Sequence, residues 1–205
     1  MRTRLLAALA VISMAAVGGC TVPSAGTPLP ASSVQPPSGS DGDLPSDGAP
    51  KVENPLEASH FERKPCDVLT SEDAETLNIP PTGEQKSNPA IGESCLWYNH
   101  DTGGSLAATF YSKDKGGLSS VYREARTESW AYFERIDDIE GHPAVAFTLK
   151  EEKPEYGCVV VVGLTDQLTF SADVALSDAN VGKSEPCPLA AKAAGMMVRT
   201  MQEAE

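Results

Sequence analysis

The sequence has little positive charge, few aromatic residues and only three histidines. Of its 205 residues, 16 are Lys or Arg and 29 are Asp or Glu, and aromatic residues make up 6%. A surface with this excess of negative charge repels the phosphates of nucleic acids and of anionic lipid headgroups. The composition therefore excludes a nucleic-acid-binding protein and a peripheral membrane protein that binds through a polybasic surface.

Long hydrophobic runs are also missing. The most apolar stretch spans only residues 5–17, which is shorter than the roughly 20 residues a helix needs to cross the hydrocarbon core of a bilayer. Arg2 and Arg4 precede it and small residues follow it, a pattern typical of an export signal. Residues 17–20 (VGGC) resemble the bacterial lipobox, whose cysteine is acylated and becomes the mature N-terminus.

Residues 1–19 are therefore expected to be a lipoprotein signal peptide and Cys20 the lipid-carrying residue, with palmitate among its acyl groups. The alternative is a plain secreted protein with an unpaired cysteine. Two or three acyl chains suffice for stable anchoring, so the expected location is the extracytoplasmic face of the cell membrane. Cleavage removes two arginines and leaves 14 basic and 29 acidic residues, a formal charge of −15.

Residues 20–55 are dominated by Pro, Ser, Gly, Ala and Asp, with few large apolar side chains. Such a segment buries too little surface to offset its ordering entropy, so a disordered tether is expected here. The alternative is a disordered tail whose length has no role. Residues 56–205 have the size of one ordinary domain.

Four cysteines follow the predicted tether: Cys66, Cys95, Cys158 and Cys187. An even number in an exported chain predicts two disulfides, with three possible connectivities. Cys66 is separated from Cys95 by the same interval as Cys158 from Cys187, which favours these two pairs without deciding among the three patterns. Zinc binding is the weaker alternative, because no C-x-x-C motif occurs.

Motifs for catalysis are missing as well. The sequence contains no G-x-S-x-G, H-E-x-x-H or Walker motif. Its histidines are His60, His100 and His142, of which the last two lie in expected turns and are interpreted as solvated; His142 is expected to serve the turn itself. No catalytic residue, metal ligand or cofactor is predicted.

Hydrophobic patterns predict three helices and six strands. Residues 69–73 (LTSED) offer a hydroxyl N-cap followed by acidic residues, which predicts a short helix that ends before Pro80. Apolar positions at i, i+3, i+4 and i+7 from Leu118 predict a second helix over 118–125. The strands are expected at residues 95–99, 106–111, 133–139, 144–149, 156–164 and 168–176.

A third helix is expected to begin at Pro186 with Ser184 as its cap. The four valines at 159–162 suit a central strand that is covered on both faces. The order helix, two strands, helix, four strands, helix predicts an α+β fold: a meandering, mainly antiparallel sheet packed with about three helices and cross-linked by two disulfides.

Two further groups of side chains are candidates for binding. An acidic group within residues 134–140 offers oxygen ligands for calcium but lacks the spacing of a calcium loop, so a solvated strand edge is the preferred interpretation. The aromatic group is the better candidate for recognition, although core packing also explains Trp97 and leaves Trp130 as the residue expected at the surface. The acidic group is Glu134, Asp137, Asp138 and Glu140, and the aromatic group is Trp97, Tyr98, Trp130, Tyr132 and Phe133.

Short motifs in a fixed order connect the chain to a known family. They are residues 54–56 (NPL), 65–66 (PC), 95–97 (CLW), 141–145 (GHPAV), 157–161 (GCVVV) and 187–190 (CPLA). In this order they resemble an actinobacterial lipoprotein family, domain of unknown function 3558. The resemblance implies an envelope location and supports the disulfides, but the family carries no established activity and no catalytic residues to transfer.

The expected function is that of a non-enzymatic lipoprotein that displays a binding domain for another envelope component, which is a protein, a glycan or a lipid. The alternative is a hydrolase or lipid carrier that acts on a wall or lipid substrate through a pocket hidden from sequence. A third possibility is a scaffold that spaces other wall proteins. A deep apolar cavity would favour a carrier, and a flat aromatic patch would favour a protein-binding module.

Overall fold

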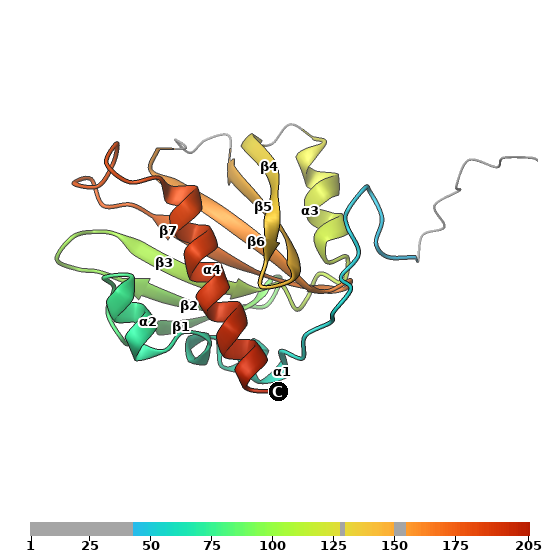
Figure 1. The fold of residues 1–205 in the computed structure, drawn as a ribbon, viewed down its shortest axis with the longest axis horizontal. Coiled ribbons are helices and arrows are strands. Elements are labelled where there is room, and N and C mark those ends of the chain that lie inside the picture. The colour runs from blue at the N-terminus through green and yellow to red at the C-terminus, as the bar shows by residue number, and fades with distance from the viewer. Residues whose placement is uncertain (1–42, 128–129, 150–154) are drawn as a thin grey trace, which may run out of the picture. The chain divides into compact units, whose positions relative to one another are not determined.

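The computed structural model describes residues 43–127, 130–149 and 155–205, so the predicted signal peptide, Cys20 and most of the predicted tether lie outside the described residues. None of the helices in these ranges combines the length and hydropathy that a membrane span requires. The elements, in chain order, are α1 (Ser59–Arg63), the 3₁₀ helix η1 (Pro65–Val68), α2 (Ser71–Thr76), β1 (Glu84–Asn88), β2 (Gly92–Tyr98), β3 (Ser105–Phe110), α3 (Leu118–Ala125), β4 (Trp130–Ile139), β5 (His142–Leu149), β6 (Gly157–Thr165), β7 (Leu168–Ala175) and α4 (Pro186–Glu203) (Figure 1).

The strands of the described chain form one seven-stranded antiparallel sheet in the order β1-β2-β3-β7-β6-β5-β4. The first three and the last four strands are two meanders, and β3 joins them by pairing with β7. In this central pair Ala108 lies opposite Ala172, and Phe110 opposite Phe170. The arrangement confirms the predicted α+β class and antiparallel sheet.

Helix α4 lies across one face of the sheet, over β6 and β7 (Figure 1). The stripe that it buries is made mainly of small residues and methionines. The small residues let the helix approach the strands closely, and the methionines fill the remaining gaps. Its fully buried members are Ala190, Ala193, Ala194, Met197, Val198 and Met201. Beneath it, the rings of Phe110 and Phe170 stack with centroids 5.8 Å apart.

Strand β6 is buried on both faces, as the run of valines predicts. Val160 and Val162 belong to the core on the α4 side, whereas Val159 and Val161 pack on the opposite face with Leu118 of α3. The period of two along a strand sends neighbouring side chains to opposite faces, so a strand covered on both sides carries no polar alternation.

The start of α4 differs from the prediction. Its N-cap is Glu185, and no side chain caps the helix. The N–H of Ser184 donates instead to the carbonyl of Asn180 at 3.0 Å, so Ser184 closes the preceding turn. Pro186 at the first helical position has no N–H to satisfy, which lowers the demand for a cap.

The folded domain begins before the boundary predicted at residue 56. The N–H of Ser46 donates to Ser119 Oγ at 2.8 Å, and the N–H of Val52 donates to Asp166 Oδ1 at 2.9 Å. Val52 is also buried. From this segment the two hydrogen bonds use only backbone N–H groups, so a composition rich in Pro, Ser and Gly does not reveal them.

The acidic group lies along and just beyond edge strand β4. Glu134, Asp137 and Asp138 are exposed, and Glu140 pairs with Arg199 of α4. Within the described ranges, no group of three or more His, Cys, Asp or Glu residues is placed to hold a metal ion. Charged side chains on an edge strand discourage pairing with another chain, and this placement agrees with a solvated edge.

The structure contains the two disulfides that the equal spacing favours. Cys66 pairs with Cys95 and ties η1 to β2, and Cys158 pairs with Cys187 and ties β6 to the first turn of α4. Both pairs join a helix to a strand of the sheet. Cys95 and Cys158 are buried on the α4 side of the core.

Candidate functional site

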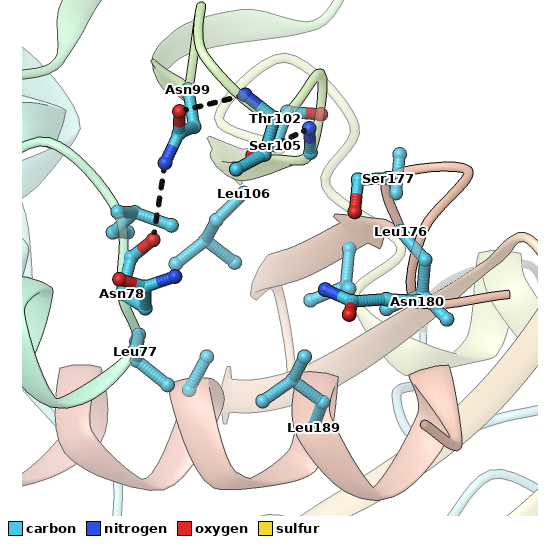
Figure 2. A pocket seen from close by; sticks show the side chains of 15 residues that line it. Leu77, Asn78, Asn99, Thr102, Ser105, Leu106, Leu176, Ser177, Asn180 and Leu189 are labelled. Carbon is cyan, nitrogen blue, oxygen red and sulfur yellow. Dashed lines mark hydrogen bonds between the residues drawn. The ribbon is translucent and has the colours of Figure 1, made fainter. Parts of the chain in front are cut away.

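A pocket of about 130 Å³ opens where β3 begins and β7 ends, beside the N-terminal half of α4 (Figure 2). The loop after α2 and the turn after β7 complete its wall. Aliphatic side chains and uncharged polar groups share the lining, which comprises Leu77, Asn78, Ile79, Asn99, Thr102, Gly104, Ser105, Leu106, Val174, Ala175, Leu176, Ser177, Asn180, Leu189 and Ala193. None of these side chains carries a charge.

The end of α2 brings Leu77 and Ile79 to the pocket. Asn78 adopts a positive φ of 55°, and its N–H donates to the carbonyl of Glu75 at 3.0 Å. The N–H of Ile79 then donates to the carbonyl of Ala74 at 3.0 Å. This pair of bonds is a Schellman motif, which asparagine tolerates because it enters the left-handed region more readily than most residues.

The side chain of Asn99 joins two walls of the pocket. Its Oδ1 accepts from the N–H groups of Asp101 and Thr102 at 3.0 and 3.1 Å, which shapes the turn between β2 and β3. Its Nδ2 donates to the carbonyl of Asn78 at 3.4 Å, as the dashed lines of Figure 2 show. The amide is therefore engaged in holding the walls together and contributes little free hydrogen-bonding capacity.

The side chain of Ser177, which follows β7, differs from that of Asn99 in its hydrogen bonding. Its side chain is 4% exposed, and its Oγ is the one buried side-chain nitrogen or oxygen within residues 43–127, 130–149 and 155–205 that has no hydrogen-bond partner. In Figure 2 this hydroxyl points into the space between Leu106, Leu176 and Asn180. A buried hydroxyl without a partner is destabilising by its desolvation cost.

The turn after β7 fixes this hydroxyl through the backbone. The carbonyl of Ser177 accepts from the N–H groups of Asn180 and Val181 at 2.8 and 3.2 Å. The same turn directs the amide of Asn180 toward the pocket (Figure 2). Polar groups from one short segment therefore lie on one side of the pocket, opposite Leu77 and Leu106.

Replacing Ser177 with alanine is expected to raise the free energy of unfolding by about 1 kcal/mol, because the substitution removes an unpaired polar atom and almost no volume. For a domain of this size the melting temperature should rise by roughly 2–4 °C. Denaturation by heat and by urea measures both quantities on the full processed chain.

Ser119→Ala is the matched control. Ser119 is also buried, but its hydroxyl accepts a hydrogen bond from the N–H of Ser46. Its removal leaves that donor without a partner and should lower the free energy of unfolding by about 1 kcal/mol. A loss of stability in Ser177→Ala equal to that in Ser119→Ala would show that the Ser177 hydroxyl has a partner in the folded protein.

The predicted aromatic group does not form one site. Trp97 is 1% exposed in the core on the α4 side, whereas Trp130 and Phe133 pack on the opposite face of the sheet. Tyr98 is exposed and contacts the ring of His100. Sequence proximity misleads here because neighbouring residues of a strand point to opposite faces.

A smaller pocket of about 90 Å³ lies between α3 and the sheet. Trp130 lines it and stacks on Phe147 with ring centroids 4.1 Å apart. Burial is the main cause that raises the pKa of Tyr111, whose hydroxyl lies 3.4 Å from Ser171 Oγ. The hydroxyl of Tyr111 therefore has a protein partner, unlike that of Ser177.

The three histidines occupy separate environments. His60 Nε2 lies 2.8 Å from Asp67 Oδ2 on the surface, and His100 is exposed in the turn between β2 and β3. His142 corrects the prediction of a solvated turn residue: it is 2% exposed, and its Nδ1 lies 3.2 Å from the carbonyl oxygen of Gly163. The imidazole therefore links the first residue of β5 to the backbone of β6.

The sequence patterns place Asn99 at the end of a predicted strand and single out neither Ser177 nor Asn180. Nothing in the local sequence separates Ser177 from other serines that follow a strand. Its distinguishing property is burial without a partner, which depends on segments far apart in the chain. Cys20 lies outside the described residues.

Comparison with known proteins identifies one family. The family model described as Protein of unknown function (DUF3558) matches residues 15–200. The chain belongs to the DUF3558 family. No curated protein and no solved structure matches this DUF3558 chain.

Proposed function

We propose that this DUF3558 protein is a lipoprotein anchored through Cys20 at the extracytoplasmic face of the membrane, and that its domain binds another envelope component without chemical conversion. One observation carries the binding role: the pocket buries the Ser177 hydroxyl and leaves it unpaired among the described residues. Such a group costs stability in the free protein, and a ligand that pairs with it recovers that cost.

The lining of the pocket favours binding over catalysis. Its members include no His, Cys, Asp, Glu, Lys or Tyr side chain that would act as an acid, a base or an activated nucleophile. Its volume of about 130 Å³ is also far below the roughly 300 Å³ or more of a pocket that encloses a drug-sized ligand. A carrier for a long acyl chain needs more room.

The anchoring proposal rests on residues 1–20. The positive start, the short apolar stretch and the small residues before Cys20 are the parts of a lipoprotein signal. The family match begins at residue 15 and so includes this cysteine. The formal charge of −15 after cleavage supports a covalent lipid as the membrane attachment, because an acidic surface gains nothing from anionic headgroups.

Cys20→Ser is expected to move the protein from the membrane fraction to the medium, or to stop processing of the signal. The cause is the loss of the thiol that accepts the lipid. Cell fractionation, together with mass measurement of the N-terminal peptide, tests this. A processed Cys20→Ser protein that stays with the membrane would contradict the lipid anchor, and Cys66→Ser controls for loss of a cysteine elsewhere.

The binding role has its own test in intact cells. A photoreactive amino acid at Thr102, on the rim of the pocket, should cross-link an envelope component upon illumination. The same amino acid at Ile91, which is exposed and outside the lining, should not capture that component. Equal capture from both positions, or none from Thr102, would contradict binding at the pocket.

A further inference from the structure

We infer that the pocket between α2, β3, β7 and α4 takes an uncharged aliphatic amide group of about six to eight non-hydrogen atoms, whose amide pairs with Ser177 Oγ and Asn180 and whose branched aliphatic end packs on Leu77, Leu106 and Leu189. This inference rests on the proposed binding function and specifies its ligand.

The absence of charge in the lining sets the first property of the ligand. None of the described lining residues has an ionised side chain to pair with a carboxylate, phosphate or ammonium group. Moving a charged group from water into these surroundings has a large desolvation cost, and no opposite charge in the lining offsets it. The bound group is therefore neutral.

The placement of the polar atoms sets the second property. Ser177 Oγ can donate one hydrogen bond and accept two, and the Asn180 amide both donates and accepts. Figure 2 shows both groups directed into the pocket from the same turn. An amide carries a donor and an acceptor side by side, and so it satisfies both residues, whereas an ether offers an acceptor without a donor and a hydrocarbon offers neither.

The opposite wall sets the third property. Leu77 and Leu106 lie on it, and Leu189 and Ala193 of α4 add to the aliphatic lining. No aromatic ring belongs to the described lining, so it provides no platform for stacking a sugar ring or a nucleobase. Aliphatic walls of this kind are complementary to a branched aliphatic group.

The volume limits the size of the group. An apolar cavity of roughly 150 Å³ holds benzene, which has six non-hydrogen atoms. The pocket has about 130 Å³ and is open to solvent at the rim formed by Thr102 and Asn180. It therefore accepts a group such as 3-methylbutanamide, either free or at the end of a larger molecule.

The test uses three probes of nearly equal size on a chain produced from residue 20 onward with Cys20→Ser, which carries neither the signal peptide nor an acyl chain. The probes are 3-methylbutanamide, 3-methylbutanoate and 3-methylbutylamine, and binding is followed by methyl resonances of the pocket leucines. The amide should shift these resonances and saturate. The anionic and cationic probes should bind at least about tenfold more weakly, because each places a charge in a neutral pocket.

Variants separate the hydroxyl from the rest of the pocket. Ser177→Ala should weaken binding of 3-methylbutanamide about two- to tenfold, the effect of one neutral hydrogen bond. Ser87→Ala, on the exposed strand β1 outside the lining, should leave it unchanged. Equal binding of all three probes, shifts confined to resonances elsewhere, or unchanged binding in Ser177→Ala would overturn the inference.

A fourth probe distinguishes the two sources of the group. N-acetyl-leucinamide carries the branched end and the amide on a peptide unit; tighter binding than 3-methylbutanamide assigns the group to a larger envelope molecule, and weaker binding assigns it to a free small molecule. If no probe binds but the photoreactive residue at Thr102 still captures a component in cells, the amide ligand class is wrong and the proposed binding function is retained. If no probe binds and Thr102 captures nothing in cells, both the ligand class and the proposed binding function are contradicted.

Discussion

Replacing Cys158 and Cys187 together with alanine is expected to lower the free energy of unfolding by about 2–5 kcal/mol and the melting temperature by roughly 5–20 °C. The disulfide closes a loop with a sequence separation of 29, for which the chain-entropy relation gives about 3.6 kcal/mol. Domains of this size are stable by only about 5–15 kcal/mol. One disulfide therefore accounts for a large share of the total.

The second disulfide provides the matched comparison, because Cys66 and Cys95 also have a sequence separation of 29. Cys66→Ala with Cys95→Ala should lower stability to a similar extent. The two variants differ at the pocket: Cys187 lies in the first turn of α4, just before Leu189 of the lining, and ties it to β6. Loss of the Cys158–Cys187 bond should therefore also weaken probe binding more than loss of the other.

Calorimetry and urea denaturation of both double variants measure these effects, with the protein reduced under native conditions as an independent check. Reduction of the unsubstituted chain should reproduce the combined loss without the small change in buried volume that alanine introduces. An unchanged melt after complete reduction, verified by counting free thiols, would show that the bridges contribute nothing to stability. Equal probe binding in the two variants would show that the bond at α4 does not position the pocket.

The core of the fold follows directly from sequence periodicity. The valines at 159–162 identify the strand buried on both faces, and the spacing from Leu118 identifies α3. A hydroxyl caps α2 as predicted, and the residue is Thr70, whose Oγ1 accepts from the N–H of Asp73 at 3.1 Å. In each case a local pattern indicates which face is buried or which group caps a helix, and such patterns can be recognised in a single sequence.

The elements that were not predicted are stabilised by tertiary pairing. Strand β1 (Glu84–Asn88) is exposed at all five positions and has no hydrophobic alternation. It is a strand because its backbone pairs with β2, with Gln85 opposite Cys95. Helix α1 and η1 are a single turn each and bury only Phe61, Pro65 and Val68 between them. Segments so short carry too little periodicity to be assigned.

The candidate site is beyond local sequence patterns for the same reason. Four separate segments of the chain meet at the pocket: the end of α2, the β2–β3 turn, the end of β7 and the start of α4. In the sequence Asn99 is only the last residue of a predicted strand, and the fold shows that its amide reaches Asn78. The unpaired state of Ser177 is a property of the whole enclosure, which no single segment encodes.

Gly117→Ala is expected to lower the free energy of unfolding by about 3 kcal/mol or more, through two separate costs. Gly117 is the N-cap of α3 and has φ +54° and ψ −140°, a conformation that residues with a Cβ rarely adopt. A Cβ built there would lie 2.3 Å from the carbonyl oxygen of Asp166, in the turn between β6 and β7. Backbone atoms on both sides would have to move.

Gly182→Ala separates the two costs, because Gly182 also has a positive φ of 73° but no atom lies within 4 Å of its added Cβ. This variant should lose only about 1 kcal/mol, the cost of the left-handed conformation. The difference between the two variants, measured by urea denaturation, then reports the contact between α3 and the β6–β7 turn. Because α3 covers the sheet face opposite the pocket, Gly117→Ala should weaken the packing around Trp130. Binding of 3-methylbutanamide to the folded fraction should be unchanged. Equal losses of stability in the two variants would mean that α3 moves away from Asp166 without a free-energy cost.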